Sequence, residues 1–423
     1  MIKVVDSRCG SGKTSYIIDY INSLDKDIKV LYITPFLSET ERMRQGCSDR
    51  DFRLPDTRRG KGSKYRDLMN LIENGENIAS THALFLNVGR EFMDLVASKN
   101  YILVLDEVMG VVDQLFIDSG AREDVTSNDI NTLAKKKIIE IDKNCLVRWA
   151  SDEYHLSKYD DIRRLIDLEL VYYVDKTTLI WVYPPEMFSG DVFKDIFILT
   201  YQFDCQIQSY YYQYFNIEYE MYYVEDGGGR NYKLLPYRGA DGDVAWRKEI
   251  KELITICDDS RLNAVGDYYV SEGGKRIRSA LSKQWYMDAT DKDLAKVKNN
   301  IYNYFRHISE SSGEKRLWTC FKDDIKKMKN SYASAKSWLA CSCRASNDYA
   351  DRNVLVYPIN RYINPFYQKF FSQRGIKIDM DKYALSELIQ WLFRSAIRNG
   401  QPVSLYIPSQ RMRTLLVRWL DGE

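Results

Sequence analysis

The first residues of the chain combine small, basic and hydroxyl side chains in an order that suits phosphate chemistry. The apolar run Ile2–Val5 is followed by the segment DSRCGSGKT, which spans Asp6–Thr14. Apolar residues then recur at helical spacing, at Ile17, Ile21 and Leu24. A strand, a glycine-containing loop, Gly-Lys-Thr and a helix in this order predict a phosphate-binding loop of the P-loop type.

Each residue type in this loop has a physical role at its position. Small residues at Gly10, Ser11 and Gly12 let successive backbone N–H groups converge on phosphate oxygens, and the following helix N-terminus adds its dipole. We expect Lys13 to reach the β- and γ-phosphates of ATP and the Thr14 hydroxyl to bind Mg²⁺. Ser7 stands where such loops usually begin with glycine.

An acidic pair supplies the second half of a magnesium-dependent phosphate site. The continuous apolar run Tyr101–Leu105 is typical of a buried parallel strand, and Asp106 and Glu107 follow it directly. The carboxyl end of such a strand faces the ligand in an open α/β sheet. The sequence therefore predicts that Asp106 holds Mg²⁺, mostly through water, and that Glu107 orients and deprotonates the attacking water.

The composition limits what kind of protein carries these residues. At 423 residues and 45% hydrophobic content, the chain is long enough for two or three domains with large cores. Its 61 Lys and Arg against 60 Asp and Glu exclude a globally basic nucleic-acid binder, so such binding requires local clustering. The eight cysteines lack zinc-ligand spacing, and no apolar run approaches a membrane span, so we expect a cytoplasmic protein without a membrane partner.

Strand and helix patterns alternate along most of the chain. Strands are expected in the first half at Val30–Thr34, Ile78–Ser80, Leu179–Val182 and Ile196–Leu199. In the second half they are expected at Met221–Val224, Leu262–Val265, Arg316–Thr319, Trp338–Cys341, Val354–Tyr357 and Val403–Ile407, with helices at Asp291–Ser309 and Tyr383–Arg398. The alternation predicts an α/β fold with parallel sheets in two domains, 1–205 and 206–423. Residues 113–175 are longer and more charged than a simple crossover, and we expect a mostly helical insertion there.

Further motifs make the chain resemble superfamily two helicases, specifically the DEAD-like helicase proteins of phages and other mobile elements. Beyond the phosphate-binding loop and the acidic pair, the resemblance rests on Tyr32–Pro35, Ser80–His82, Leu199–Asp204, Arg344–Tyr349, Tyr357–Pro365 and Ala384–Arg398. After the acidic pair the chain continues Val108-Met109 and departs from the usual pattern. The resemblance implies two RecA-like P-loop NTPase-type domains, the first carrying the insertion, with ATP bound between them.

The last of these segments is similar to the arginine motif of that superfamily. Gln390, Arg394 and Arg398 are spaced four apart, so one helix face would carry all three. The resemblance implies that Gln390 contacts the triphosphate and that Arg394 or Arg398 is an arginine finger, with Arg398 preferred. The usual motif places its last arginine one residue closer to the glutamine. The alternative is a solvent-facing arginine ladder on an amphipathic helix.

Nucleic-acid contacts are expected at two places. The resemblance assigns Thr34 and Thr81 to hydroxyl contacts with strand phosphates, which position a strand without reading bases. The basic run that contains Arg58, Arg59 and Lys61 suits a phosphate backbone, although a solvated loop has the same composition. Two further basic patches, Lys275–Arg278 and Arg411–Arg413, are more typical of solvated faces.

Together these residues predict an ATP- and Mg²⁺-dependent enzyme. The resemblance implies a DNA helicase or translocase of superfamily two in phage or mobile-element DNA replication, acting on single-stranded or forked DNA with replication proteins as partners. If the chain is phage-encoded, it acts in the cytoplasm of a bacterial host. The alternative is a DNA-packaging-type or switch-like P-loop ATPase without unwinding activity.

Overall fold

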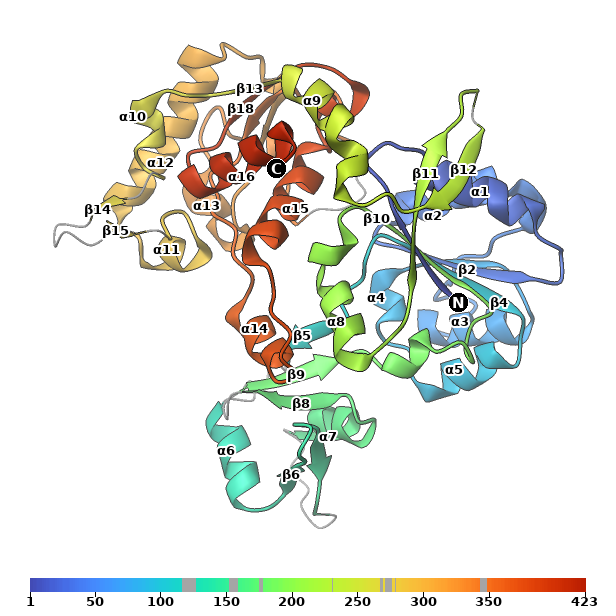
Figure 1. Cartoon of the computed structure of the whole chain (residues 1–423). Coiled ribbons are helices and arrows are strands. Elements are labelled where there is room, and N and C mark those ends of the chain that lie inside the picture. The colour runs from blue at the N-terminus through green and yellow to red at the C-terminus, as the bar shows by residue number, and fades with distance from the viewer. Residues whose placement is uncertain are drawn as a thin grey trace. The chain divides into compact units, whose positions relative to one another are not determined.

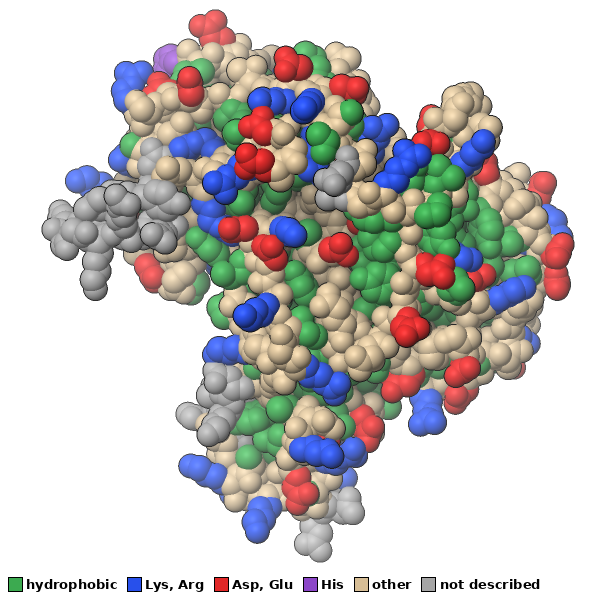
Figure 2. All heavy atoms as spheres, viewed as in Figure 1, with side chains coloured by type: hydrophobic (Ala, Val, Ile, Leu, Met, Phe, Trp, Pro, Cys, Tyr) green, Lys and Arg blue, Asp and Glu red, His purple; other side chains and the backbone are tan. Residues whose placement is uncertain are grey.

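The computed structural model describes residues 1–115, 127–151, 159–174, 178–229, 231–266, 269–270, 276–277, 279–342 and 348–423. Within these residues the chain forms two compact units (Figure 1). The first comprises Met1–Val5, Thr14–Tyr222 and Asn364–Ile378, and the second comprises Asp6–Lys13, Tyr223–Ile363 and Asp379–Glu423. On the face shown in Figure 2, Lys and Arg side chains are interspersed with Asp and Glu, in keeping with the net charge of +1.

The main strands of the first unit belong to a seven-stranded sheet with the order β12-β11-β1-β10-β4-β2-β3, of which β12 and the end of β11 are counted in the second unit. Its strands are β1 (Ile2–Asp6), β2 (Lys29–Thr34), β3 (Ile78–Thr81), β4 (Tyr101–Asp106), β10 (Ile196–Thr200), β11 (Glu220–Asp226) and β12 (Tyr232–Pro236). The pairs β1–β11, β10–β4, β4–β2 and β2–β3 are parallel. Because β4 and β10 are continuous apolar runs, they are buried along their whole length, which confirms two of the expected inner strands.

Helices follow these strands as the alternating pattern predicts. They are α1 (Lys13–Ser23), α2 (Leu37–Gly46), α3 (Lys64–Glu73), α4 (His82–Phe85), α5 (Arg90–Ala97) and α8 (Ile207–Phe215). One further helix of the first unit, α14 (Pro365–Ser372), comes from much later in the chain. It packs against α8 and against a strand of the insertion (Figure 1).

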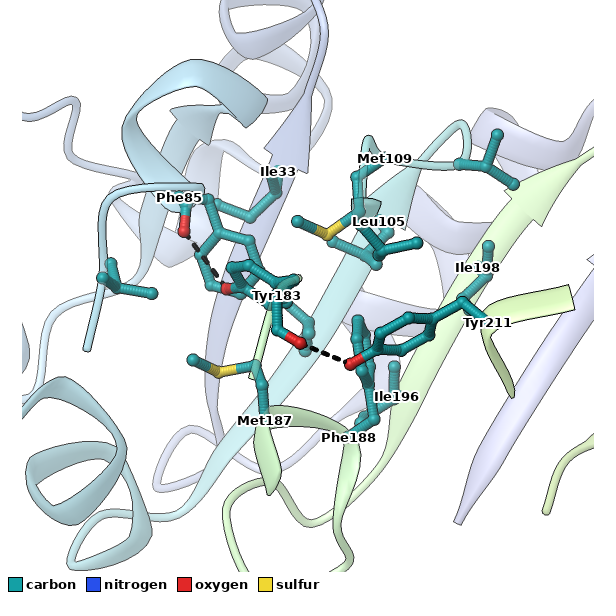
Figure 3. Packing of buried hydrophobic residues seen from close by; sticks show 14 of the residues in the cluster. Ile33, Phe85, Leu105, Met109, Tyr183, Met187, Phe188, Ile196, Ile198 and Tyr211 are labelled. Carbon is teal, nitrogen blue, oxygen red and sulfur yellow. Dashed lines mark hydrogen bonds between the residues drawn. The ribbon is translucent and has the colours of Figure 1, made fainter. Parts of the chain in front are cut away.

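Two tyrosines, Tyr183 and Tyr211, pack in the apolar core of the first unit, and their hydroxyl groups are hydrogen-bonded inside it. Tyr183 donates a hydrogen bond to the carbonyl of Phe85 at 3.1 Å, and Tyr211 donates to the carbonyl of Tyr183 at 2.7 Å (Figure 3). Around them pack apolar side chains from the sheet, including Ile33 and Leu105. Because each buried hydroxyl has an acceptor, these rings contribute apolar burial without an unpaired polar group.

The insertion differs from the mostly helical segment that the sequence predicts. Its described part is mixed and consists of β5 (Val112–Gln114), α6 (Ser127–Lys135), β6 (Ile139–Ile141), β7 (Val147–Trp149), α7 (Asp160–Asp167), β8 (Val171–Val174) and β9 (Thr178–Val182). Strands β5, β9 and β8 form an antiparallel sheet, so the expected strand Leu179–Val182 exists but lies outside the parallel sheet. The β-branched and aromatic residues of β8 and β9 favour strands over helix, in spite of the charge around them.

The second unit contains a parallel four-stranded sheet with the order β13-β18-β17-β16. Its strands are β13 (Ile254–Ile256), β16 (Arg316–Trp318), β17 (Val354–Val356) and β18 (Val403–Tyr406). Its helices are α9 (Val244–Glu252), α10 (Ser260–Asn263), α11 (Lys283–Asp288), α12 (Asp291–Asn303), α13 (Ile325–Met328), α15 (Met380–Leu392) and α16 (Gln410–Asp421). Two short strands, β14 (Tyr269–Val270) and β15 (Arg276–Ile277), pair antiparallel. The predicted α/β class with parallel sheets is therefore confirmed.

Three expectations for the second half are wrong in detail. Met221–Val224 lies in β11 of the first sheet, not in the second sheet. Leu262–Val265 begins inside α10, because the Asp259 carboxylate accepts the backbone N–H groups of the next turn and starts a helix. Trp338–Cys341 contributes a single bridge to the backbone of Trp318 rather than a strand.

The domain limits at residue 205 stay predictions, because a compact unit defined by its internal contacts is not thereby an independently folding domain. No helix within the described ranges is long and apolar enough to cross a membrane.

Candidate nucleotide-binding site

The phosphate-binding loop joins β1 to α1, and two glycines give it its shape. Gly10 has φ 81° and Gly12 has φ 87°, which is the left-handed region where glycine carries no steric penalty. A Cβ on Gly12 would also lie 2.2 Å from the ring of Tyr232. Both positions therefore require glycine, as expected of a loop whose backbone turns tightly around an anion.

Lys13 is held inside this loop by backbone carbonyls. Its ammonium group donates to the carbonyl of Ser7 at 2.7 Å and to that of Arg8 at 3.1 Å. Lys13 and Thr14 are the first two residues of α1, so both stand at the positive end of the helix dipole. Within the described chain the buried Ser11 hydroxyl has no hydrogen-bond partner. The Lys13 ammonium, the Ser11 hydroxyl and the Thr14 hydroxyl are the groups that phosphate oxygens and Mg²⁺ would contact.

Ser7 explains the departure at the first position of the loop. Its side chain is buried, and its hydroxyl oxygen accepts the backbone N–H of Val224 in β11 at 2.7 Å. Glycine at this position could not make that bond. The sequence shows the substitution, but only the neighbouring strand shows what the hydroxyl does.

The acidic pair lies at the carboxyl edge of the first sheet, as the sequence predicts. Asp106 ends β4, is 8% exposed and accepts a hydrogen bond from the hydroxyl of Tyr32 in β2. Burial, followed by the charge of Asp106, raises the pKa of Tyr32 well above its usual range, so Tyr32 remains a donor. Tyr32 is a residue that sequence reasoning missed, and the register of β2 against β4 is what brings it to Asp106.

Two non-glycine residues at this edge have left-handed backbones. Glu107 has φ 71°, and its N–H donates to the carbonyl of Leu199 in β10 at 2.8 Å. Gln202, just after β10, has φ 58°. Such conformations cost free energy and persist where the surrounding structure fixes them, commonly at functional sites.

Hydroxyl side chains at the same edge are buried rather than exposed. Thr34 and Thr200 end β2 and β10, both are 0% exposed, and neither hydroxyl has a hydrogen-bond partner among the described residues. Thr81 pairs in register with Thr34 and is half-buried. The Thr34 hydroxyl is therefore less accessible than a phosphate contact requires in this conformation.

The arginine motif does not form one helical face. Helix α15 ends at Leu392, whose carbonyl accepts the Ser395 hydroxyl at 2.6 Å, and Arg398 lies in a separate 3₁₀ turn, Ala396–Asn399. Ser395 is extended between them, with φ −90° and ψ −172°. The expected helix Tyr383–Arg398 is thus too long at its end, because it runs through this break.

The alternative of a solvent-facing ladder is also wrong for two of the three residues. Gln390 is 4% exposed and Arg394 is 6% exposed. Neither amide atom of Gln390 has a hydrogen-bond partner within the described chain. Arg398 lines a cavity together with the outer residues of the phosphate-binding loop, all within the second unit, whereas Arg394 is not one of the residues found to line it.

The basic loop before α3 contains residues of two kinds. Arg59 forms an ion pair with the buried Asp67 at 2.9 Å and donates to the carbonyl of Leu54 at 2.6 Å. Arg58 and Lys61 are exposed, and Arg59 is exposed as well although it is paired. Arg59 therefore stabilises the loop, and Arg58 and Lys61 are the side chains more available to a nucleic-acid backbone.

The remaining basic patches are partly structural. Arg411 forms an ion pair with Asp381 at 2.6 Å and donates to the carbonyl of Arg361 at 2.7 Å, and Arg413 donates to the carbonyl of Pro408 at 2.6 Å. The expectation of a solvated face is wrong there. Lys275, Arg278 and Arg344–Asn347 lie outside the described residues.

Within the described ranges no group of three or more His, Cys, Asp or Glu side chains could hold a metal ion.

Known proteins are similar to this chain in sequence and in architecture. Residues 248–420 match the YonV C-terminal Rossmann-like domain, and residues 121–181 match the YonV middle domain. The chain is 35% identical over 430 residues to the SPbeta prophage-derived uncharacterized protein YonV of Bacillus subtilis (strain 168), covering 100% of this chain and 99% of that protein.

A structure of apo XPD is similar with a TM-score of 0.51 and 12% identity, covering 98% of this chain and 95% of that one. Xpd4 of S. tokodaii gives a TM-score of 0.48 and 13% identity, with 99% and 94% covered. The likeness to XPD shows the fold, two RecA-like α/β domains.

Proposed function

The chain belongs to the YonV family, and we propose that it is a nucleic-acid-dependent ATPase, a helicase or translocase of superfamily two that acts on phage or mobile-element DNA. The observation that carries the proposal is the phosphate-binding loop, in which two left-handed glycines and the enclosed Lys13 form a cradle for an anion. A parallel sheet that ends in Asp106 and Glu107 supports it.

The residues of the chain divide the proposed chemistry among them. Lys13 and the loop N–H groups hold the phosphates, and Thr14 and Asp106 hold the Mg²⁺ ion, with Tyr32 fixing the Asp106 carboxylate. When bound, Mg²⁺ neutralises charge that develops on the phosphate oxygens. Glu107 orients the attacking water and accepts its proton.

The second unit contributes the groups that sense the triphosphate. Gln390 carries two buried amide atoms without a partner within the described chain, which suits a residue that bonds a ligand in another state. Arg398 is the proposed finger, because it shares a cavity with the phosphate-binding loop. Arg394 lies buried after the end of α15 and positions this region.

The test separates ATP binding from ATP turnover. Lys13→Ala should weaken ATP binding and abolish hydrolysis, because it removes a charge-assisted contact to the phosphates. Glu107→Gln should keep binding and stop turnover, because it keeps the shape of the side chain and removes the base. Isothermal titration with MgATP and a phosphate-release assay, each with and without single-stranded DNA, measure both.

Exposed residues of the same types serve as matched controls. Lys194→Ala and Glu73→Gln change exposed side chains and should leave both quantities unchanged. Normal turnover in Glu107→Gln would overturn the assignment of the base. ATP turnover that DNA does not stimulate would instead favour a switch-like ATPase or a DNA-packaging-type motor without unwinding activity.

A further inference from the structure

A cavity of about 480 Å³ lies beside the phosphate-binding loop, and every residue that lines it belongs to the second unit. The outer part of the loop, Asp6–Ser11, forms one side of this cavity. Strand β11 and the segment that leads into α9 form the others, and Arg398 also lines the cavity. The volume is in the range of cavities that hold small organic ligands.

Two flat groups face the cavity from different elements. On one wall the Arg8 guanidinium lies 5.5 Å from the centre of the Trp246 ring. Trp246 is held from behind by Phe393 at 5.2 Å and Trp419 at 5.9 Å, measured between ring centres. A planar guanidinium on a fixed indole offers a stacking surface to an aromatic ligand.

The second wall repeats this arrangement. The Arg238 guanidinium lies 4.7 Å from the centre of the Tyr223 ring, and its other partner is the Glu225 carboxylate at 3.3 Å. Both walls therefore present flat cationic and aromatic groups, which suit a planar heterocycle better than a flexible chain.

The charges of the cavity favour a nucleoside over further phosphates. Five acidic residues line it against three arginines, and two of these arginines, Arg8 and Arg238, lie over the ring walls. The acidic residues are Asp6, Glu225, Asp226, Asp243 and Glu249. Carboxylates accept hydrogen bonds from amino and hydroxyl groups and repel phosphate oxygens. The phosphates thus belong on the loop beside Arg398, and the amino-bearing base and the ribose hydroxyls belong along the Trp246 and Tyr223 walls.

We infer that this cavity binds the nucleoside half of the nucleotide, an amino-bearing purine stacked between the Arg8–Trp246 and Arg238–Tyr223 walls. The inference rests on the proposed function, since it takes the loop next to the cavity as the phosphate site. It makes Trp246 and Arg238 the residues that distinguish a nucleoside triphosphate from inorganic triphosphate.

The experiment compares two probes on the full-length chain, MgATP and inorganic tripolyphosphate, by isothermal titration. The wild-type protein should bind ATP more tightly, because the base adds stacking. Trp246→Ala and Arg238→Ala should each weaken ATP binding by about tenfold or more, the loss expected for one stacked base, and leave tripolyphosphate affinity unchanged. GTP, which also carries an exocyclic amine, tests the choice of purine.

A second variant and a matched control keep the outcome interpretable. Trp246 packs on two other rings, so Trp246→Ala can lower stability, whereas the Arg238 side chain is 60% exposed and its loss leaves the core intact. Trp285→Ala, outside the cavity in α11, should change neither affinity. Equal affinities for ATP and tripolyphosphate in the wild type, or normal ATP affinity in both variants, would overturn the inference while the phosphate site stands. If neither probe binds, the proposed function itself fails.

Discussion

At the scale of single residues, Ser7 shows what a hydroxyl side chain adds at a position where phosphate-binding loops usually have glycine. Its hydroxyl ties the phosphate-binding loop to β11 by accepting the Val224 N–H. Ser7→Ala leaves that buried N–H without an acceptor, so it should lower the free energy of unfolding by about 1–3 kcal/mol. Urea titration measures the change. Ser98→Ala removes an exposed hydroxyl at a helix end and should stay within about 0.5 kcal/mol of the wild type; an equal loss in both would remove the special role of Ser7.

The basic loop gives a second prediction at this scale. Arg58→Ala and Lys61→Ala should each reduce the salt dependence of single-stranded DNA affinity, by about 0.7 in the logarithmic slope for each phosphate that the side chain neutralises. Arg59→Ala should lower the free energy of unfolding instead, because the buried Asp67 loses its cation. Fluorescence anisotropy across salt concentrations and urea titration measure the two effects. Slopes unchanged by Arg58→Ala and Lys61→Ala would make the loop purely structural.

At the scale of elements, α15 carries a polar side chain, Gln390, that the described residues around it do not satisfy. Gln390→Met keeps the approximate volume and removes two buried amide atoms that have no partner within the described chain, so it should raise the free energy of unfolding by about 1–3 kcal/mol. ATP turnover should fall at the same time, by about 10²-fold, if the amide contacts the triphosphate. Gln45→Met on the exposed face of α2 should change neither quantity. Normal turnover in Gln390→Met would assign the residue to packing alone.

Helix α14 is the element that the first unit takes from the second half of the chain. Phe370 is fully buried and stacks on Tyr214 with ring centres 4.4 Å apart. Phe370→Ala should lower the free energy of unfolding by about 3–5 kcal/mol, because it leaves a cavity among aromatic rings. Phe36→Ala, where the ring is 36% exposed, should cost much less. Urea titration of both variants decides whether α14 is integral to the first unit or only rests on it.

At the scale of the whole molecule, buried tyrosines make stability depend on alkaline pH. Burial raises the pKa values of Tyr183, Tyr211 and Tyr286 well above the usual tyrosine value. The folded chain keeps these protons while the unfolded chain releases them above about pH 10, so stability is intact below that pH and falls above it. Urea titrations between about pH 8 and 11 should show this fall, and Tyr183→Phe should make it shallower. Stability that stays level to the highest pH would contradict the prediction.

The parts of this architecture that could be predicted from sequence are those that one local pattern determines. Continuous apolar runs predicted β4 and β10, and the glycine, lysine and threonine spacing predicted the loop and the start of α1. These signals need no knowledge of a distant partner. The residues assigned to ATP and Mg²⁺ remain predictions, because they concern ligands and not the local backbone.

The errors occur where distant residues decide the outcome. The four-residue spacing of Gln390, Arg394 and Arg398 gives no sign of the break at Ser395, so it predicts too long a helix. The charged composition of the insertion likewise gives no sign that β8 and β9 pair as strands. The partner of Asp106 could not be predicted either, since Tyr32 reaches it only through the register of two strands far apart in the sequence. Ion pairing had the same limit, because only the fold shows that Arg59 is paired with Asp67.

The composition of the two compact units also limits how the chain can be divided. The chain passes from one unit to the other after Val5, Lys13, Tyr222, Ile363 and Ile378. A fragment that stops at Tyr222 would lack α14 and leave the rings of Tyr214 and Tyr172 uncovered, and a fragment that starts there would lack Asp6–Lys13. A single cut at any internal position therefore cannot deliver a complete unit. We expect that no contiguous fragment of the chain reproduces either unit in full.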